Sequence, residues 1–350
     1  MNLKVSNLIY FFLSLLSGWP SVKWLIKRLA VLVVTVFTAI TINFFLVRMM
    51  PGNPIDILIN EYMSLGMSYE EAAAAVAAIV PFIPTKPLHE QYIDYIIGIL
   101  SGNLGKSISL AQPVTLILMY AIPWTVFIVS ISLMVSFSIG IVAGMYMAYR
   151  RGGLLDKALS IFASVTSGFP SYAIGVLLAI TLGVKFKIFP YRGAYDYWVK
   201  PGFNLEFIVS VFSHAILPVM TYVVTTVGGW MLAMKSSTTS VLGEYYVKTA
   251  EARGLPDRRI ILTYVGRNAI LPLFTRLTIS LGYMFGGVVF IETIFSYPGI
   301  GRYLSVSISR RDYILMSGCF LVTTVAVIAA NFLADLLYSK LDPRIKLGEE

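Results

Sequence analysis

The most constraining feature of this sequence is a series of long stretches without a single charged residue. Each reaches the roughly 20 residues that a helix needs to cross a bilayer. These stretches are residues 29–47, 107–149, 158–184, 207–234 and 313–334. A sixth, residues 269–295, carries Arg276 and Glu292 but is free of charge between them. The 43-residue window 107–149 is too long for one perpendicular helix. We therefore expect it to break at Pro123, and a similar break is considered at Pro218.

The composition agrees with a chain that is dissolved in lipid. Hydrophobic residues make up 57% and charged residues 13% of the chain, against about 45–50% and about 25% in soluble domains. Only helices or closed barrels satisfy the backbone in lipid, and the apolar runs do not alternate as barrel strands do. The sequence thus predicts an all-α integral membrane protein with six transmembrane helices. One cysteine and two histidines leave no multi-cysteine zinc site, and we expect no metal and no cofactor.

The net charge of +9 is compatible with nucleic acid binding, an anionic membrane face or membrane topology. With the N-terminus placed inside, 17 of the 27 basic residues and 8 of the 18 acidic ones fall in inner segments. The net charge is then +9 inside and zero outside, as the positive-inside rule requires. This distribution predicts cytoplasmic N- and C-termini and a multi-pass protein of the cell membrane, and it needs no nucleic acid partner.

The first outer segment, residues 51–112, is the longest. Ser68 and Glu71 fit a capping box, and Pro81 would stop the alanine-rich helix that follows it. A second helix is expected over residues 88–100. We expect packing on the outer face, with contact to a substrate-delivering partner as the alternative. The Gly105-Lys106-Ser107 run is no phosphate loop, because Leu100 stands where the motif needs glycine.

Two further apolar segments allow more than one interpretation. Residues 8–16 are too short to span and lack a cleavage site, so an interfacial helix within residues 1–23 is favoured over a signal peptide. The outer loop 185–206 is rich in aromatic residues. We expect these rings to form an interfacial belt, and stacking against substrate is the alternative.

The cytoplasmic loop between the fourth and fifth spans, about residues 236–268, is the most informative. Helix-forming residues lead up to Gly254, which permits the positive φ of a helix end. Pro256 and Asp257 then favour a new helix start. The pattern predicts two short helices that meet at a glycine. An ordinary basic loop that only sets the orientation would need lysine and arginine but not this design.

These residues resemble the coupling loop of ATP-binding-cassette importer permeases. That loop consists of a helix of small residues, then a glycine, and later a hydrophobic residue followed by Leu-Pro. Here Ala250, Gly254 and Ile270-Leu271-Pro272 take those places. Lys248-Thr249-Ala250 stands in place of the generic Glu-Ala-Ala, and the gap from Gly254 to Leu271 is longer than in the generic sugar permeases. Both departures look like the oligopeptide/dipeptide/nickel branch. Further matches to that branch, over about residues 24–345, are Arg48-Met49-Met50-Pro51-Gly52-Asn53-Pro54, Gly102-Asn103-Leu104-Gly105-Lys106-Ser107, Arg151-Gly152-Gly153 to Asp156, Gly168-Phe169-Pro170-Ser171, Glu292 to Gly301, Arg311-Asp312-Tyr313 and Asp335 to Asp342-Pro343-Arg344.

The resemblance implies a permease subunit without its own ATPase site, the first of two that pair in this branch. Its implied partners are a second homologous permease, two cytoplasmic ATPase subunits and an external binding protein. The implied layout is a first span over residues 24–50, a five-helix core over residues 113–345 and a tail over residues 346–350. The loop would sit in a groove of the ATPase, with Arg253, Arg258 and Arg259 pairing with its acids. The implied coupling residues are Lys248, Thr249, Ala250, Glu251, Ala252, Arg253, Gly254, Leu255, Pro256, Asp257 and Arg258.

Several residues outside the loop admit structural or functional interpretations. Packing is expected for Gly140-x-x-x-Gly144 and Gly282-x-x-x-Gly286, and for His214. Glu292, an acid within a span, is expected to pair with Arg302 or Arg310. Asn331 and Asp335 share a helix face and are expected to bond across helices.

An ion-coupled secondary transporter is the alternative function, but no internal repeat or midplane acid favours it. An intramembrane enzyme would need catalytic residues at depth, and the sequence shows none. The substrate stays open among peptides, nickel complexes and oligosaccharides, because specificity lies largely with the binding protein.

Overall fold

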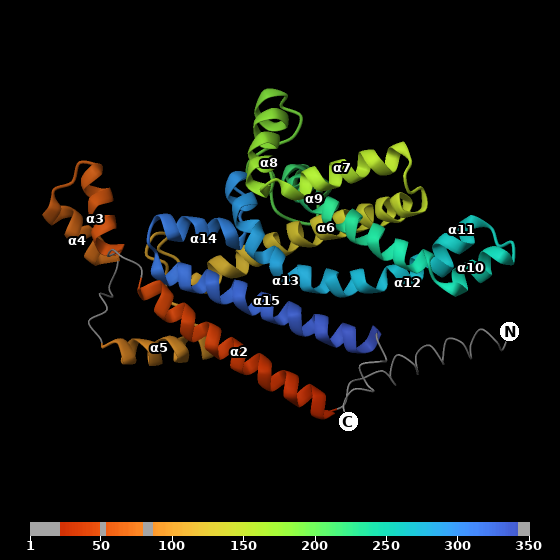
Figure 1. Cartoon of the computed structure of the whole chain (residues 1–350). Helices are drawn as coiled ribbons and strands as arrows, with labels where there is room; N and C mark the ends of the chain where they lie inside the picture. The colour runs from red at the N-terminus through yellow and green to blue at the C-terminus, as the bar shows by residue number, and fades with distance from the viewer. Residues whose placement is uncertain (1–21, 50–53, 80–86, 342–350) are drawn as a thin grey trace.

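The structure, a computed structural model, describes residues 22–49, 54–79 and 87–341, and these residues are helical with no β-strand among them. Figure 1 shows long helices running side by side. The helices are α2 (Val22–Arg48), α3 (Pro54–Ser64), α4 (Tyr69–Ile79), α5 (Leu88–Leu100), α6 (Val114–Tyr149), α7 (Leu154–Gly168), α8 (Ser171–Leu178), η1 (Ala179–Lys185), α9 (Leu205–Leu242), α10 (Tyr245–Ala252), α11 (Asp257–Arg259), η2 (Ile260–Gly266), α12 (Arg267–Ala269), α13 (Leu271–Ile294), α14 (Ile300–Ser309) and α15 (Tyr313–Leu341).

Within the described residues, four helices are long and apolar enough to cross a membrane, namely α2, α6, α9 and α15. A fifth span results if α7 and the α8–η1 helix, which are bent by 101° at their junction, are taken together. The fold class of an all-α integral membrane protein is therefore confirmed. The sixth predicted span coincides with α13, a helix of 24 residues that holds Arg276 and Glu292.

Two expectations about helix breaks are wrong. Both α6 and α9 continue through their prolines, Pro123 and Pro218. Proline is tolerated in membrane helices because neighbouring helices and local adjustments satisfy the backbone groups that it frees. The 158–184 window, by contrast, is not one straight helix. It breaks at Phe169, whose ψ of 134° is extended, as steric conflict with the ring of Pro170 favours.

The core of the bundle lies between α6 and α9, which pack along each other, while α7 also packs on α9. At Gly140 and Gly144 a Cβ atom would overlap the α9 residues Trp230 and Met231, respectively. The expected close packing of this glycine pair is thus confirmed. The side chains around Gly282 and Gly286 lie outside the described part of the chain.

A second layer consists of α13, α15 and α2, in which α15 packs on both of the others. Apolar side chains of α2 such as Val33, Val34 and Phe37 are more than half exposed, as expected for a helix whose solvent is lipid. The helices α10 and α11 lie at one end of the bundle, and α3 and α4 lie at the opposite end (Figure 1).

The outer segment contains the two expected helices and one more. The capping box of α4 is confirmed, because the Ser68 N–H donates to Glu71 Oε2 at 3.0 Å and the Glu71 N–H donates to Ser68 Oγ at 3.3 Å. The Ser68 N–H and the Ser68 hydroxyl both donate to the Glu71 carboxylate, and these hydrogen bonds lower the pKa of Glu71. The expected helix over residues 88–100 is α5, whereas α3 was not predicted. The side chain of Ile108 packs against the α3–α4 core.

Some predictions fall outside the described residues. These are the interfacial helix within residues 1–23, the stop at Pro81, the tail over residues 346–350 and the motif residues 50–53 and 342–344. The side-chain contacts of Asp335 also lie outside them, so its expected bonding with Asn331 stays a prediction.

Candidate functional site

The expected helix–glycine–helix arrangement is present at the end of α9. Helix α10 has eight residues and ends before Gly254, whose φ of +71° is the left-handed conformation that glycine adopts without strain. The Gly254 N–H donates to the Glu251 carbonyl at 2.8 Å and closes the helix end. Pro256 caps α11, which starts at Asp257. We call residues 243–259 the elbow.

A small apolar core gives the elbow a fixed shape. Val247 and Ala250 of α10 are buried against Ile260 and Val265 of η2. Val241 of α9 packs against the same cluster. The elbow is therefore attached firmly to the end of α9 and does not hang as a free loop.

Two hydrogen bonds link this region to α12, which directly precedes α13. Asn268 Nδ2 donates to the Tyr246 hydroxyl at 2.9 Å, and Ser237 Oγ donates to the Ala269 carbonyl at 2.7 Å. Pro272 stands in the first turn of α13, where its missing N–H is not needed. A displacement of the elbow would therefore reach both α9 and α13.

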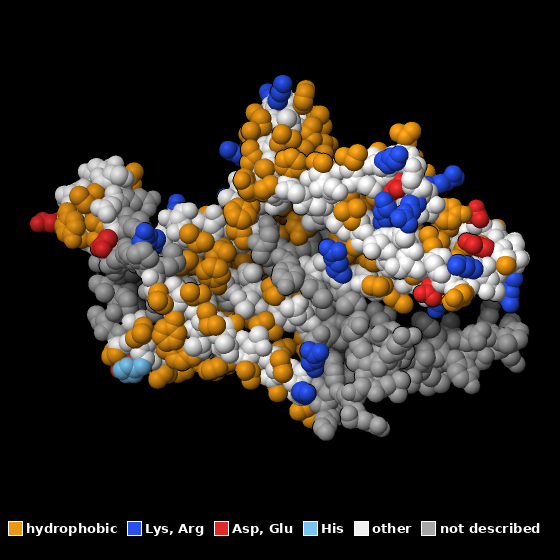
Figure 2. Space-filling view, viewed as in Figure 1, with side chains coloured by type: hydrophobic (Ala, Val, Ile, Leu, Met, Phe, Trp, Pro, Cys, Tyr) orange, Lys and Arg blue, Asp and Glu red, His pale blue; other side chains and the backbone are white. Residues whose placement is uncertain are grey.

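The outer face of the elbow is exposed and charged. Of the predicted coupling residues Ala250 is buried, Leu255 is half-buried and the others are exposed. The exposed residues include Arg253, Arg258 and Arg259. Figure 2 shows charged side chains of both signs gathered at this end, while apolar side chains cover much of the middle of the molecule. The elbow can therefore offer a rigid, polar docking face.

The Arg151-Gly152-Gly153 to Asp156 motif braces the same end of the bundle. The Asp156 carboxylate is buried and accepts hydrogen bonds from the Gly152 N–H at 2.9 Å and from Lys235 Nζ of α9 at 2.5 Å. The motif residues thus fix the start of α7 to the C-terminal half of α9.

Two distant motifs meet at the end of the bundle opposite the elbow. Asp312 is fully buried, and its Oδ2 accepts hydrogen bonds from the hydroxyls of Ser107 and Ser109 at 2.5 and 2.9 Å. Its Oδ1 accepts the Leu315 N–H at 3.0 Å and so caps α15. Ser107, which belongs to the Gly105-Lys106-Ser107 run, therefore fixes the outer segment to the start of α15.

The expected pairing of Glu292 with an arginine is wrong. Its fully buried carboxylate accepts hydrogen bonds from the Gly301 N–H at 2.7 Å and from the Thr125 hydroxyl at 2.7 Å. The Arg302 guanidinium instead donates to the Ser296 carbonyl, and that of Arg310 to the Ser109 carbonyl. Glu292 is held at the positive N-terminus of α14, so amides replace the expected cation.

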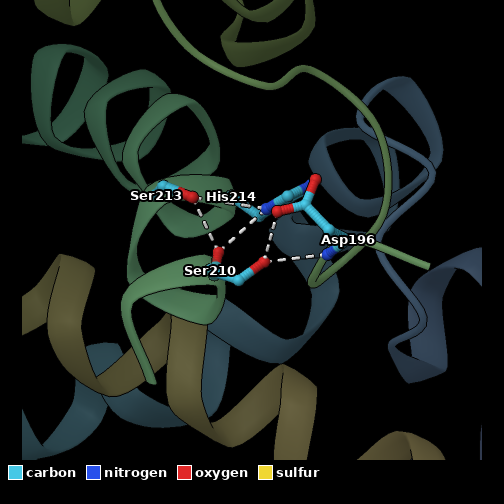
Figure 3. A network of polar contacts seen from close by, with 4 residues as sticks. All are labelled: Asp196, Ser210, Ser213 and His214. Carbon is cyan, nitrogen blue, oxygen red and sulfur yellow. Dashed lines mark hydrogen bonds and ion pairs between the residues drawn. The ribbon is translucent and has the colours of Figure 1, made fainter. Parts of the chain in front are cut away.

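The expected packed histidine, His214, is buried within a polar cluster that joins the outer loop to α9 (Figure 3). Its Nδ1 lies 2.8 Å from the Ser210 carbonyl, and its Nε2 lies 3.8 Å from Asp196 Oδ1. The Ser210 hydroxyl donates to Asp196 Oδ2 at 2.8 Å and not to the imidazole. The Ser213 hydroxyl lies 3.4 Å from His214 Nδ1 but donates to the Ser210 carbonyl at 2.8 Å. Neither serine therefore gives its proton to the imidazole, and the cluster acts as a structural anchor.

The aromatic loop divides into two parts. Tyr195 stacks on Trp124 at a centroid distance of 5.9 Å and so belongs to the core. Tyr197, Trp198 and Phe203 are strongly exposed. The exposed rings suit an interfacial belt, although stacking against substrate stays an open alternative.

Comparisons with known proteins agree with this arrangement. The family described as "Binding-protein-dependent transport system inner membrane component" matches residues 140–347. The di/tripeptide transport system permease protein DppB of Pseudomonas aeruginosa (strain UCBPP-PA14) is 31% identical over 339 residues, which cover 93% of this chain and 98% of that protein. The dipeptide transport system permease protein DppB of Escherichia coli (strain K12) is 30% identical over 341 residues, covering 93% and 98%.

The family match takes in the elbow, the Asp156 brace and the Glu292 site, and the relatives align with nearly the whole chain. The chain belongs to the family of binding-protein-dependent transport system inner membrane components, and it is a multi-pass permease subunit of an ATP-binding-cassette importer.

Proposed function

We propose that this chain and a second, homologous permease form the path of a peptide importer. Two cytoplasmic ATPase subunits would supply the energy, and an external binding protein would deliver the peptide. Peptides are favoured because the relatives are named as dipeptide or di/tripeptide permeases. The observation that carries the proposal is the rigid, exposed elbow at the end of α9.

The elbow would receive the movement of the ATPase. Its core joins it to α9, and the Ser237–Ala269 hydrogen bond joins α9 to α12, directly before α13. A push on α10 would therefore shift two long helices together. Arg253, Arg258 and Arg259 would face acidic residues of the ATPase, where exposed charges tune association more than affinity.

The proposed topology has six spans with both termini in the cytoplasm. Five come from α2, α6, α7 with α8–η1, α9 and α15, and α13 would be the sixth. The elbow would then lie inside and α3–α5 outside, and the charge distribution supports this orientation. ATP would be bound by the partner subunits, and this chain would hold no cofactor of its own.

Reconstitution tests the transport mechanism. The chain would be purified with its genomic neighbours, placed in proteoliposomes with ATP enclosed, and supplied with a labelled tripeptide on its binding protein. We expect uptake that requires ATP and persists when ion gradients are collapsed. Uptake driven by an ion gradient without ATP would instead support a secondary transporter. A labelled oligosaccharide and a nickel complex, run in parallel, test the substrate class.

Cross-linking tests the role of the elbow. The native cysteine, Cys319, is buried, so a cysteine introduced at the exposed Glu251 provides an accessible thiol. A short bifunctional reagent should link this variant to the ATPase subunit. A cysteine at Tyr197, which is 92% exposed on the outer loop, serves as the matched control and should not form that link. The same adduct at both positions, or at neither, would contradict the proposed docking.

A further inference from the structure

A cavity of about 260 Å³ lies among α6, α7, α9 and α13. Its wall is mixed in character. Hydroxyls come from Ser167, Thr226 and Ser280, aromatic rings come from Tyr222 and Trp230, and the charge comes from Arg276. No acidic side chain is among the described residues that line it.

The cation is held at the wall and stays available. The Arg276 guanidinium lies over the Trp230 ring, 5.5 Å from its centroid, a favourable stacking for arginine. Gly229 leaves room beside it, since a Cβ atom there would lie 3.8 Å from Arg276 Nη2. Among the described residues, neither a carboxylate nor another hydrogen-bond acceptor pairs with this guanidinium.

The position of this cation within a predicted span makes it unusual. Arg276 stands in the second turn of α13, about 8 Å from the helix start at Leu271. Leu133, near the middle of α6, lines the same cavity. Ionisable side chains within membrane segments are costly and often mark ligand or ion pathways. Arg276 is exposed in the single chain, so a second subunit could complete the cavity.

We propose that this cavity is a transient site for the C-terminal carboxylate of the transported peptide. The proposal rests on the peptide path proposed above. The guanidinium would bind the carboxylate with two parallel hydrogen bonds. The hydroxyls of Ser167, Thr226 and Ser280 donate to carbonyls of their own helices, and one that turns away from its carbonyl would donate to a remaining lone pair of the carboxylate. The rings of Tyr222 and Trp230 would flank the terminal side chain.

The size and exposure of the site fit a resting point on the path. Its volume is below the roughly 300–1,000 Å³ of pockets that enclose a drug-sized ligand, so it holds one terminal residue and leaves the rest of the peptide outside. A single cation in a partly open wall binds a carboxylate without trapping it. Conduction needs such sites, which ligands enter readily and also leave.

The test compares a tripeptide with a free carboxylate and its C-terminal amide in proteoliposomes that contain the complete transporter. The peptide pair is chosen so that the binding protein binds both forms, and uptake is normalised to loaded binding protein. Arg276→Gln removes the positive charge, and Arg276→Lys keeps the charge but not the planar guanidinium that makes two parallel hydrogen bonds. Lys185→Gln, at an exposed cation of η1 away from the cavity, is the matched control.

We expect Arg276→Gln to slow uptake of the free-carboxylate peptide about tenfold, the equivalent of about 1.4 kcal/mol, and to change amide uptake less than about twofold. Arg276→Lys should fall in between, and Lys185→Gln should match the wild type.

Four outcomes would overturn the proposal. Equal loss for both peptides would assign Arg276 a structural role, and no loss would remove the site. If the Arg276→Gln variant loses the second permease on purification, the guanidinium pairs with an acidic residue of that partner. If the effect of the variant depends on the anionic lipid content, the guanidinium binds a lipid phosphate. If the wild type itself shows no ATP-dependent uptake, the proposed function fails first and separately.

Discussion

The conformation of Gly254 allows a test that separates the shape of the elbow from the surface it presents. The residue has a φ of +71°, and a Cβ atom built on it meets no atom within 4 Å. A side chain at this position therefore meets no obstacle inside the chain. Any loss of function must come from the backbone conformation or from what a partner places in that open space.

The backbone contribution can be estimated. A left-handed conformation costs an ordinary residue about 1–2 kcal/mol, least for asparagine and aspartate and most for β-branched residues. For Gly254→Val a cost of about 2 kcal/mol would lower the population of the observed elbow conformation, relative to other conformations, by roughly 30-fold. For Gly254→Asn the corresponding factor is only a few-fold. The small core of Val247, Ala250, Ile260 and Val265 has little reserve to offset the larger cost.

The assay is peptide-stimulated ATP hydrolysis and peptide uptake by the reconstituted transporter. We expect Gly254→Val to lose most coupled uptake and Gly254→Asn to keep most of it, with equal amounts of each variant in the membrane. We expect Gly254→Asp to block transport, because it adds an acid to a basic face that would meet acidic residues of the ATPase.

Normal uptake by the valine variant would refute this reasoning, since the positive φ would then be dispensable. If the asparagine variant fails as badly as the valine variant, the backbone explanation is wrong. The open space in front of Gly254 would then be occupied by the partner.

Three further predictions concern the ends of the bundle. Lys235→Met should lower the unfolding free energy by about 2 kcal/mol, because it leaves the Asp156 carboxylate without its cation, and adding Asp156→Asn should restore part of it in thermal denaturation. Asp312→Asn should release the outer segment, so that added trypsin cleaves after Lys106 faster than in the wild type; an unchanged rate would contradict the proposed link. Gly301→Ala should cost about 1–3 kcal/mol, since its methyl group would overlap the α13 backbone, and wild-type thermal stability would rule this out.

Local signals in the sequence were sufficient where the structure depends on neighbouring residues. The Ser68–Glu71 capping box, the bounds of α5 and the positive φ of Gly254 were all predicted and confirmed. Each depends on a few adjacent residues whose side chains or backbone freedom decide the result. The all-α membrane class followed in the same way from the charge-free windows.

Breaks in long helices could not be predicted from apolar windows alone. Pro123 stays inside α6, whereas the chain before Pro170 turns sharply. Both prolines lack an N–H, so the difference lies in their surroundings. α6 packs against α14 and α15 before its proline and along α9 after it, and these contacts hold the helix together. At Phe169 the chain leaves the helix, and hydropathy carries no information about that change.

The partner of Glu292 was missed for a related reason. Sequence reasoning looks for an opposite charge, but backbone amides leave no residue-type signal. One signal was present, since Gly299 and Gly301 lie where any Cβ atom would overlap the carboxylate of Glu292 or the α13 backbone. Two glycines that flank the start of a short helix after a buried acid therefore suggest that the helix N-terminus closes on that acid.

The contacts at the two ends also constrain how a movement could cross the bundle. At the outer end, Asp312 and Glu292 fix α14 and the start of α15 to their neighbours. At the elbow end, Lys235 fixes α9 to α7, and Ser237 fixes α9 to α12, directly before α13. Several buried hydrogen bonds hold the end of the bundle opposite the elbow. When the elbow moves, the displacement of the helices would therefore be largest close to the elbow and would decrease toward that opposite end. The cavity with Arg276 lies between α9 and α13 in that gradient, so the site proposed to hold the peptide carboxylate would change shape as the elbow moves.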